Sequence, residues 1–509
     1  MAKVLTTGTP WRVILAFAVP LLVGNVVQQL YQVADAFIVG RELGVDALAA
    51  VGSTGALLFL LLGFAWGMTS GFAIPTAHAF GAGDHRAVAR SVVAGTILTG
   101  AASLLITAVA LTVVGPAIGW LRTPEELVPQ AVTFATVSFA GGVATMFFNF
   151  LSAIIRAIGD SRTPLFFLAV CCVLNVGLVL LFVKYLHTGV AGAAFATVLA
   201  QAASVGMCLW YIRRSVPVLH VRREDWRIDR GDLARHLRLG LPMGFQASII
   251  AIGMIAVQVR LNELGTDAVA AFTAAGRVDG LAVAFLASLG LAVATFVAQN
   301  HGGGRPDRIR TGVLQGVGIA LVAAVVLAAL LIGFGAQIVT LFVGPDEQVV
   351  TSMAAQYLTV NGALYVLLGV LFVLRNALQG LGQTFVPTLA GIIELGLRVA
   401  VAIVLGGLYG YVGVVWSNPL AWVGAVVLLV PSYIRAHRAL GRRPVTGGPG
   451  VATTTVFVVE GSGTPGVGGT VADVADVVDL DDVGATLRPP ADDPDPVPVV
   501  PRDTTTPVC

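Results

Sequence analysis

The order of apolar and polar positions divides most of the chain into long apolar runs with short polar breaks between them. A membrane-spanning helix needs about 20 mainly apolar residues to cross a hydrocarbon core of about 30 Å. Runs of that length lie near residues 13–39, 47–77, 91–118, 130–156, 164–184, 190–212, 239–261, 268–299, 312–342, 352–379, 387–407 and 411–434. The pattern predicts an all-α polytopic membrane protein with twelve transmembrane helices.

The composition agrees with a membrane protein and excludes a soluble globular domain. Of the 509 residues, 56% are hydrophobic and 11% are charged, whereas soluble domains carry about 25% charged residues. We therefore expect a multi-pass protein of the cell inner (plasma) membrane, with the lipid bilayer as its main partner.

The apolar pattern repeats within the chain. LGVDALAA at Leu43 recurs as LGTDAVAA at Leu264, displaced by 221 residues, and IGDSRTP at Ile158 recurs as LGQTFVP at Leu381, displaced by 223. Each copy holds six predicted helices, an even number, so the copies enter the membrane in the same direction. The repeat predicts two six-helix lobes related by a pseudo-twofold axis along the membrane normal, with a substrate site in the cleft between them.

Repeat and composition together predict four parts of the chain. They are an N-terminal lobe (residues 1–212), a basic cytoplasmic linker (213–238), a C-terminal lobe (239–444) and an acidic cytoplasmic tail (445–509). The tail has ten acidic residues against two arginines and is rich in Pro, Gly, Thr and Val. Such a composition is typical of disordered segments, and we assign the tail no site.

The distribution of lysine and arginine predicts the orientation of the chain. With the N-terminus inside, the cytoplasmic segments hold 21 of these residues and the outside loops hold four. Cytoplasmic loops retain positive charge, so we expect both termini in the cytoplasm. The basic linker could bind nucleic acid, but contact with anionic lipid headgroups is the simpler interpretation, and we expect no nucleic-acid partner.

The first predicted helix carries a polar stripe that includes one carboxylate. At 100° per residue, the side chains of Asn25, Gln28, Gln29, Gln32 and Asp35 fall within one face about 120° wide. Polar groups in lipid are costly, so this face should point into the lobe or into a wet cavity. Asp35 is our candidate for the proton-coupling residue, and the three glutamines are candidate cavity residues. The alternative is an interfacial carboxylate that reaches headgroup water.

Two further helices carry charges near mid-membrane. Arg277 and Asp279 are two residues apart in the eighth helix and therefore do not face each other, so each is either a structural brace or a substrate contact. Glu394 and Arg398 in the eleventh helix have the i, i+4 spacing of an intrahelical ion pair. We interpret the pair as structural, with a role in proton coupling as the alternative.

No pattern typical of catalysis is present in the sequence. The histidines are scattered, the four cysteines lack metal-ligand spacing, and HExxH, GxSxG, GxxxxGK and CxxC are absent. We therefore expect neither an enzyme nor a bound cofactor or metal. A membrane-embedded transferase would need a cluster of acids or histidines at one face, which the sequence does not show. Without an ATP-binding motif, transport must use an ion gradient.

Several segments resemble the multidrug and toxic compound extrusion (MATE) family, whose superfamily also contains lipid-linked oligosaccharide flippases. The matching segments are QQLYQVADAFIVGRELGVDALAAVG from Gln28, AFGAGDHRAVAR from Ala79, RAIGDSRTP from Arg156, GLPMGFQASI from Gly240, GRVDGLA from Gly276, FVAQNHGGGRPDRIRTG from Phe296 and NALQGLGQT from Asn376. The resemblance implies a V-shaped two-lobe bundle that expels organic, often cationic, compounds in exchange for protons or sodium.

The sequence departs from the family at two coupling sites. Many proton-coupled members pair the first-helix Asp with N-x-x-x-D on the fifth helix, where this chain keeps Asn175 but has Val179 at the acidic position. Sodium-coupled members resemble one another in a Glu in the seventh helix and an Asp in the tenth, and both are absent here. Proton exchange through Asp35, with Asn175 as a polar cavity residue, is therefore the simpler interpretation.

The sequence as a whole predicts a secondary active multidrug efflux transporter that exchanges protons for small organic compounds by alternating access, as a monomer. A sodium-coupled drug antiporter is one alternative. A lipid-linked oligosaccharide flippase is another, and several arginines lining the cleft would favour it. Arg398 is interpreted as part of a structural pair, so Arg277 is the one convincing candidate for a deep arginine in the cleft, and the flippase ranks second.

Overall fold

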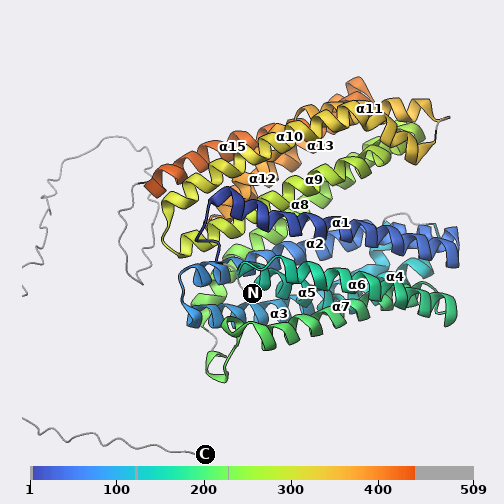
Figure 1. The fold of residues 1–509 in the computed structure, drawn as a ribbon. Helices are drawn as coiled ribbons and strands as arrows, with labels where there is room; N and C mark the ends of the chain where they lie inside the picture. The colour runs from blue at the N-terminus through green and yellow to red at the C-terminus, as the bar shows by residue number, and fades with distance from the viewer. Residues whose placement is uncertain (1–3, 121–123, 227–228, 345, 442–509) are drawn as a thin grey trace, which may run out of the picture. The chain divides into compact units, whose positions relative to one another are not determined.

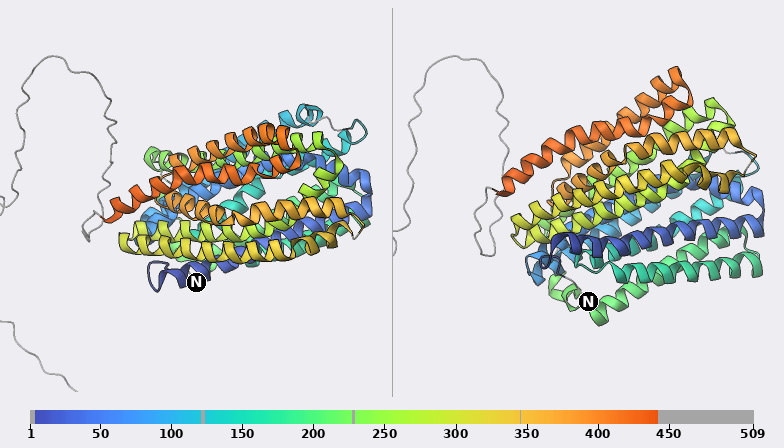
Figure 2. Two further views of the ribbon diagram at one scale, coloured as in Figure 1. Left: turned by 90° about the horizontal axis from the view of Figure 1, so that it is seen from above. Right: turned by 45° about the horizontal axis from the view of Figure 1, so that its top comes forward.

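The computed structural model describes residues 4–120, 124–226, 229–344 and 346–441. Within these ranges the secondary structure is helical and contains no strand. The long helices run side by side, and they form an N-terminal and a C-terminal group (Figure 1, Figure 2). The predicted acidic tail, residues 445–509, lies outside the described residues.

The first group, the N-lobe, is built from seven labelled helices. These are α1 (Pro10–Leu43), α2 (Val45–Gly81), α3 (His85–Trp120), α4 (Val128–Ala140), α5 (Gly142–Ala157), α6 (Arg162–Val179) and α7 (Gly189–Ser215). The segment Leu180–Tyr185 prolongs α6 as a π-helix.

The second group, the C-lobe, follows two short 3₁₀ turns at Pro217–Leu219 and Arg223–Asp225. Its helices are α8 (Arg230–Leu264), α9 (Thr266–Gly302), α10 (Pro306–Val343), α11 (Gln348–Ala363), α12 (Tyr365–Gly380), α13 (Phe385–Tyr409), α14 (Tyr411–Val415) and α15 (Ser417–Gly441).

Together the described helices form twelve candidate membrane spans. Ten stretches of helix are long and apolar enough to cross a bilayer, and two bent pairs, α4 with α5 (46°) and α11 with α12 (52°), complete the set. The prediction of a twelve-helix membrane protein is confirmed. The helices extend beyond the apolar runs because their polar ends lie past the hydrocarbon core. Thus α8 begins at Arg230, inside the predicted linker, where the Asp229 side chain caps it by accepting a hydrogen bond from the Gly231 N–H.

The internal repeat is visible in the helix boundaries. α2 and α9 each have 37 residues and begin 221 positions apart, while α6 and α13 begin 223 positions apart. The turn before α2 contains Gly44 at φ 90°, and the turn before α9 contains Gly265 at φ 102°. This left-handed region favours glycine, which explains why LGVD recurs as LGTD.

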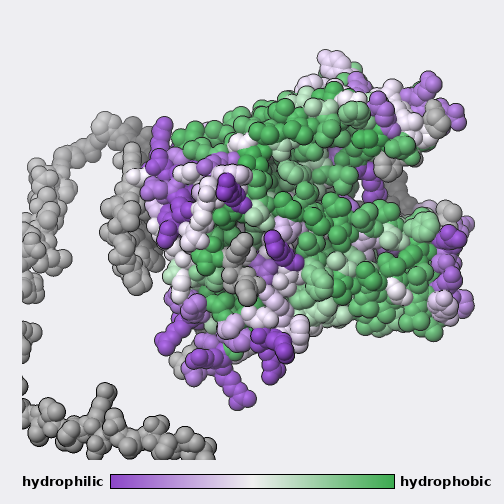
Figure 3. Space-filling model, viewed as in Figure 1, coloured by the Kyte–Doolittle hydropathy of each residue, from purple (hydrophilic) through white to green (hydrophobic). Residues whose placement is uncertain are grey.

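Large apolar side chains cover the outside of the bundle. Leu104 and Leu105 are each 66% exposed and Val173 is 75% exposed. Figure 3 shows an apolar surface between hydrophilic ends on the viewed face. Lipid tails contacting this surface remove the cost of exposing it to water.

The lobes pack closely where α2 crosses α8. A Cβ atom added to Gly71 would lie 2.6 Å from the Gly240 Cα and 2.9 Å from the Leu239 carbonyl oxygen. A Cβ atom on Gly67 would lie 3.1 Å from the Gly244 Cα. Small residues one turn apart thus allow the two backbones to touch, a common way of joining helices in membranes.

Candidate functional site

The two ends of the bundle differ in how closely the lobes approach. One end, called the basic end below, holds the start of α1 and the turns at residues 82–84, 158–161, 303–305 and 381–384. Polar contacts join the lobes there. At the opposite end Figure 3 shows the surface hollowed between the lobes, with hydrophilic surface inside the hollow, which we call the cleft.

The lobes are closed at the basic end by side chains that bond to backbone atoms of the other lobe. Gln299 of α9 donates a hydrogen bond to the Ala157 carbonyl at 2.7 Å and accepts one from the Leu5 N–H at 2.8 Å. The Nε2 atom of His78, on α2, lies 2.8 Å from the Gly380 carbonyl oxygen. Gln299 is fully buried, so its two hydrogen bonds across the lobe boundary are shielded from water.

The polar stripe on α1 does not face one environment. Asn25 donates a hydrogen bond of 2.8 Å to Ser288 of α9, across the lobe boundary. The side chains of Gln28, Gln29 and Gln32 are exposed. The side chains of the stripe therefore have different surroundings and do not all point to one lobe interior or cavity. A face about 120° wide can meet more than one neighbour.

Asp35 lies at the end of that stripe and is half-buried in the N-lobe. Its Oδ1 atom is buried and has no hydrogen-bond partner in the described part of the chain. Tyr31, one turn earlier on α1, lies close enough to interact electrostatically with the Asp35 carboxylate. The Tyr31 hydroxyl is 3.3 Å from the Thr197 hydroxyl of α7.

Asn175 of α6 belongs to the same polar cluster. It is fully buried and donates a hydrogen bond of 3.1 Å to the Thr197 hydroxyl. The Asn175 Oδ1 and, one turn beyond Thr197, the Gln201 Oε1 are buried oxygens without a donor among the described residues. We call Tyr31, Asp35, Asn175, Thr197 and Gln201 the N-lobe cluster. Sequence reasoning missed its two α7 members, since a Thr and a Gln in an apolar helix give no pattern of their own.

Asp279 of α9 lies inside the C-lobe and is 8% exposed. Its carboxylate accepts hydrogen bonds from the hydroxyl groups of Tyr357, at 3.3 Å, and Tyr365. Asn418 of α15 donates to the Tyr357 hydroxyl at 3.3 Å. Asp279 is thus hydrogen-bonded to α11 and α12 of its own lobe and, through Tyr357, is connected to α15.

Arg277 points in a different direction from Asp279 and is exposed. It lies eleven residues before Ser288, which is three turns of about 3.6 residues, so both side chains are on the same face of α9. Ser288 marks that face as the one turned toward α1. Arg277 therefore lies on the α1-facing side of α9, beyond the Asn25–Ser288 contact.

Glu394 and Arg398 form an ion pair on α13, with an Arg398 Nη2 to Glu394 Oε1 distance of 2.8 Å. Glu394 has a second partner that the sequence spacing did not show. Arg375 of α12 donates to its other oxygen at 2.6 Å. All three side chains are buried. One carboxylate is therefore shared by two guanidinium groups inside the C-lobe.

The repeat relates this network to the N-lobe cluster. Asn175 and Arg398 are 223 positions apart, the same displacement as the starts of α6 and α13. At equivalent places one lobe holds an amide oxygen without a donor and the other holds a guanidinium paired to a carboxylate. The two equivalent positions therefore differ in chemistry. Of these two, the N-lobe position is the one with an acceptor oxygen that is free to bind a proton donor or a cation.

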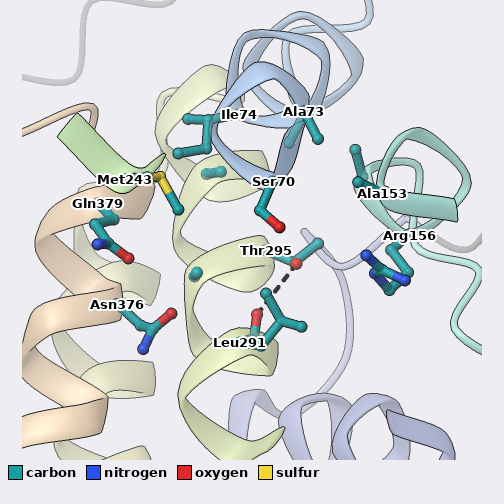
Figure 4. A pocket seen from close by; sticks show the side chains of 14 residues that line it. Ser70, Ala73, Ile74, Ala153, Arg156, Met243, Leu291, Thr295, Asn376 and Gln379 are labelled. Atoms are coloured by element: carbon teal, nitrogen blue, oxygen red, sulfur yellow. Dashed lines mark hydrogen bonds between the residues drawn. The ribbon is translucent and has the colours of Figure 1, made fainter. Parts of the chain in front are cut away.

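A cavity of about 50 Å³ lies between the lobes, next to the closed basic end. Figure 4 shows Arg156 turned into it from α5, opposite Asn376 and Gln379 of α12, with Ser70 and Thr295 between them. Arg156 and Gln379 are repeat equivalents, 223 positions apart. From the sequence, Arg156 is expected only as one of the 21 positive charges of the cytoplasmic segments. Its place at the end of an apolar run, matched with an uncharged Gln in the second repeat, was a usable signal.

A two-lobed bundle of twelve spans, with a cleft between the lobes and polar side chains along the lobe boundary, defines a helical membrane transporter. Comparison with known proteins identifies which kind. The sequence matches the MatE family over residues 20–181 and 242–404, so the chain belongs to the multidrug and toxic compound extrusion (MATE) family, and the resemblance stated above is confirmed.

Relatives and solved structures agree with this assignment. The chain is 30% identical to the probable multidrug resistance protein YpnP of Bacillus subtilis over 379 residues, covering 74% of this chain and 84% of the relative. It is also 30% identical to the probable multidrug resistance protein YoeA of the same organism, covering 78% and 87%. A structure of an outward-facing MATE family multidrug transporter aligns with TM-score 0.80 and 24% identity, covering 86% of this chain and 98% of that one, which supports the fold.

Proposed function

We propose that the protein is a secondary active exporter that exchanges protons for organic compounds across the plasma membrane, with Asp35 as the coupling carboxylate. The observation that carries this proposal is the buried Asp35 Oδ1, which has no hydrogen-bond partner among the described residues. An ionised carboxylate oxygen that is buried without a donor is costly, and uptake of a proton removes that charge.

The N-lobe cluster supports a change in packing when Asp35 is protonated. Tyr31 lies one turn from Asp35 and also contacts Thr197, so α1 and α7 meet through this group. A protonated Asp35 gains an O–H donor, and the open oxygens of Asn175 and Gln201 are acceptors within the same cluster. Protonation would then stabilise one position of α1 relative to α6 and α7 over another, which couples the proton to the lobe arrangement.

The distribution of arginine supports a cytoplasmic position for the basic end. In that orientation the described conformation is closed toward the cytoplasm by Gln299 and His78 and hollowed toward the outside. Transport by alternating access would open the basic end and close the cleft. Such a cycle couples uptake of a proton from outside to release of the exported compound on the same side.

Sodium is the second candidate coupling ion. Three buried oxygens of the N-lobe cluster, on Asp35, Asn175 and Gln201, lack donors among the described residues, and hard cations take oxygen ligands. The proton is favoured because the chain lacks the Glu in the seventh helix and the Asp in the tenth helix that sodium-coupled members of the family share.

The test is efflux of a fluorescent substrate from proteoliposomes with an imposed pH gradient or an imposed sodium gradient. Asp35→Asn keeps the volume and mimics the neutral acid, so we expect a folded protein whose efflux no longer responds to the pH gradient. Asp46→Asn is the matched control, because Asp46 is an exposed carboxylate at the start of α2. Wild-type efflux and pH dependence in Asp35→Asn would contradict the coupling role. Efflux driven by sodium alone would select the second candidate.

A further inference from the structure

The interlobe cavity contains a guanidinium without a counter-ion. Arg156 lines the cavity, and in the part of the chain that the structure describes it makes no hydrogen bond or ion pair. Arg156 is half-buried, and its guanidinium lies against the cavity instead of a carboxylate of the described residues. Arginine is well suited to hold planar anionic groups, so a guanidinium left free at the boundary between the lobes is available to a group from outside the chain.

The other walls of the cavity do not compensate this charge. The hydroxyl groups of Ser70 and Thr295 donate to carbonyls of their own helices, at 2.9 Å and 3.2 Å. Asn376 and Gln379 are neutral, and the remaining lining residues are apolar. The cavity volume of about 50 Å³ exceeds the ~15 Å³ needed for one water, so a small charged group fits.

A second unpaired arginine lies on the way to this cavity. Arg277 is exposed on the α1-facing side of α9 and, within the described residues, has no ion-pair partner. Ser288 and Thr295 follow on the same face of α9, eleven and eighteen residues later. This face therefore leads from the exposed Arg277 to Thr295, which lines the cavity together with Arg156.

The three carboxylates that lie away from the ends of the described spans do not face this route. Asp279 is buried among the tyrosines of the C-lobe, and Glu394 is held between two arginines. The Asp35 Oδ1 is buried in the N-lobe. The boundary between the lobes is thus lined by two positive charges that the chain itself does not neutralise.

We propose that the transported compounds carry an anionic group, such as a carboxylate, which Arg277 attracts into the cleft and Arg156 binds in the interlobe cavity. The guanidinium fork suits a carboxylate because it donates two parallel hydrogen bonds. This inference rests on the proposed transport function and sharpens it, since the family resemblance implies substrates that are often cationic. An organic anion, or a zwitterion with a free carboxylate, fits the site better.

The test compares two dyes that differ in one carboxylate. Rhodamine 110 has a free carboxylate and rhodamine 123 is its methyl ester. Binding to the purified protein is measured by fluorescence anisotropy in detergent, and transport is measured separately in proteoliposomes with a pH gradient. The variants are Arg156→Gln and Arg277→Gln. Arg162→Gln is the matched control, because Arg162 is exposed at the basic end and does not line the cavity.

We expect the wild type and Arg162→Gln to bind rhodamine 110 about ten-fold more tightly than its ester, the value of one charge-assisted hydrogen bond. Arg156→Gln should lose this preference and bind the ester unchanged, and Arg277→Gln should weaken it. If Arg156→Gln does not fold, the exposed Arg277 still provides the test. Equal or tighter binding of the ester by the wild type, or an unchanged preference in both variants, would overturn the inference. Selective binding without transport of either dye would instead contradict the proposed function.

Discussion

The Gln299 amide of α9 donates a hydrogen bond of 2.7 Å to the carbonyl of Ala157, the last residue of α5 on the other lobe. The same side chain accepts a hydrogen bond from the Leu5 N–H. One fully buried amide therefore joins three segments at the basic end. Because its donor and acceptor are both used across the lobe boundary, it is suited to hold that end closed.

Removal of this amide should open the basic end. Gln299→Ala leaves the Ala157 carbonyl and the Leu5 N–H without partners, at a cost of roughly 1–3 kcal/mol for each buried group. Spin labels at the exposed positions Arg86 and Asp307, in a variant without native cysteines, should report a longer and broader distance distribution by pulsed electron paramagnetic resonance. Gln258→Ala, near the opposite end of α8, is the control. The same distribution in both variants would show that Gln299 does not hold the end closed.

Alanine at Gly71 should disturb the contact between the lobes. Its Cβ atom would lie 2.6 Å from the Gly240 Cα, so α2 and α8 must move apart. Overpacking of this kind costs roughly 1–3 kcal/mol, and the thermal unfolding midpoint of the purified protein should fall by several degrees. Gly63→Ala on the same helix meets no atom within 4 Å and should leave the midpoint nearly unchanged. Equal midpoints for the two variants would contradict the close packing.

The Glu394 network should respond unequally to loss of its members. Arg398→Leu leaves the Arg375–Glu394 pair intact and should reduce the folded yield least. Glu394→Gln leaves two buried guanidinium groups without a carboxylate, so its yield should fall most, by the equivalent of about 3–5 kcal/mol. The double variant Glu394→Gln/Arg398→Leu should recover only in part, because Arg375 stays unpaired. Full recovery of the folded yield in the double variant, measured by size-exclusion chromatography, would mean that Arg375 does not pair with Glu394 in the bilayer. A full yield for Glu394→Gln with lost efflux would assign Glu394 to the mechanism.

The acidic tail should be dispensable for efflux. Its composition, with ten acidic residues against two arginines after Val445, is not suited to building a packed core. A chain ending after Arg443 should export substrate in proteoliposomes at the rate of the full chain. Loss of efflux at equal protein amount would assign the tail a function.

Local sequence features determined the number of spans and the repeat. The bilayer thickness fixes how many apolar residues a span needs, and this length can be read along the chain without knowing its neighbours. The bent pairs also appear as single apolar runs, because a bend at residue 141 or 364 changes direction without changing composition. The glycine turns at Gly44 and Gly265 recur because backbone conformation is a local property.

Tertiary structure alone decided which polar side chains meet. Helical periodicity places Glu394 and Arg398 on one face, and the ion pair between them follows, whereas Arg375 reaches the same carboxylate from α12. The angle of a residue on its helix says nothing about the identity of the neighbouring helix. For the same reason, the sequence could name Asp35 and Asn175 as candidates but could not connect them through Thr197 of α7. Whether Arg156 has a partner likewise depends on which residues line the cavity around it. The lining comes from both packed lobes, so no single segment of the sequence shows it.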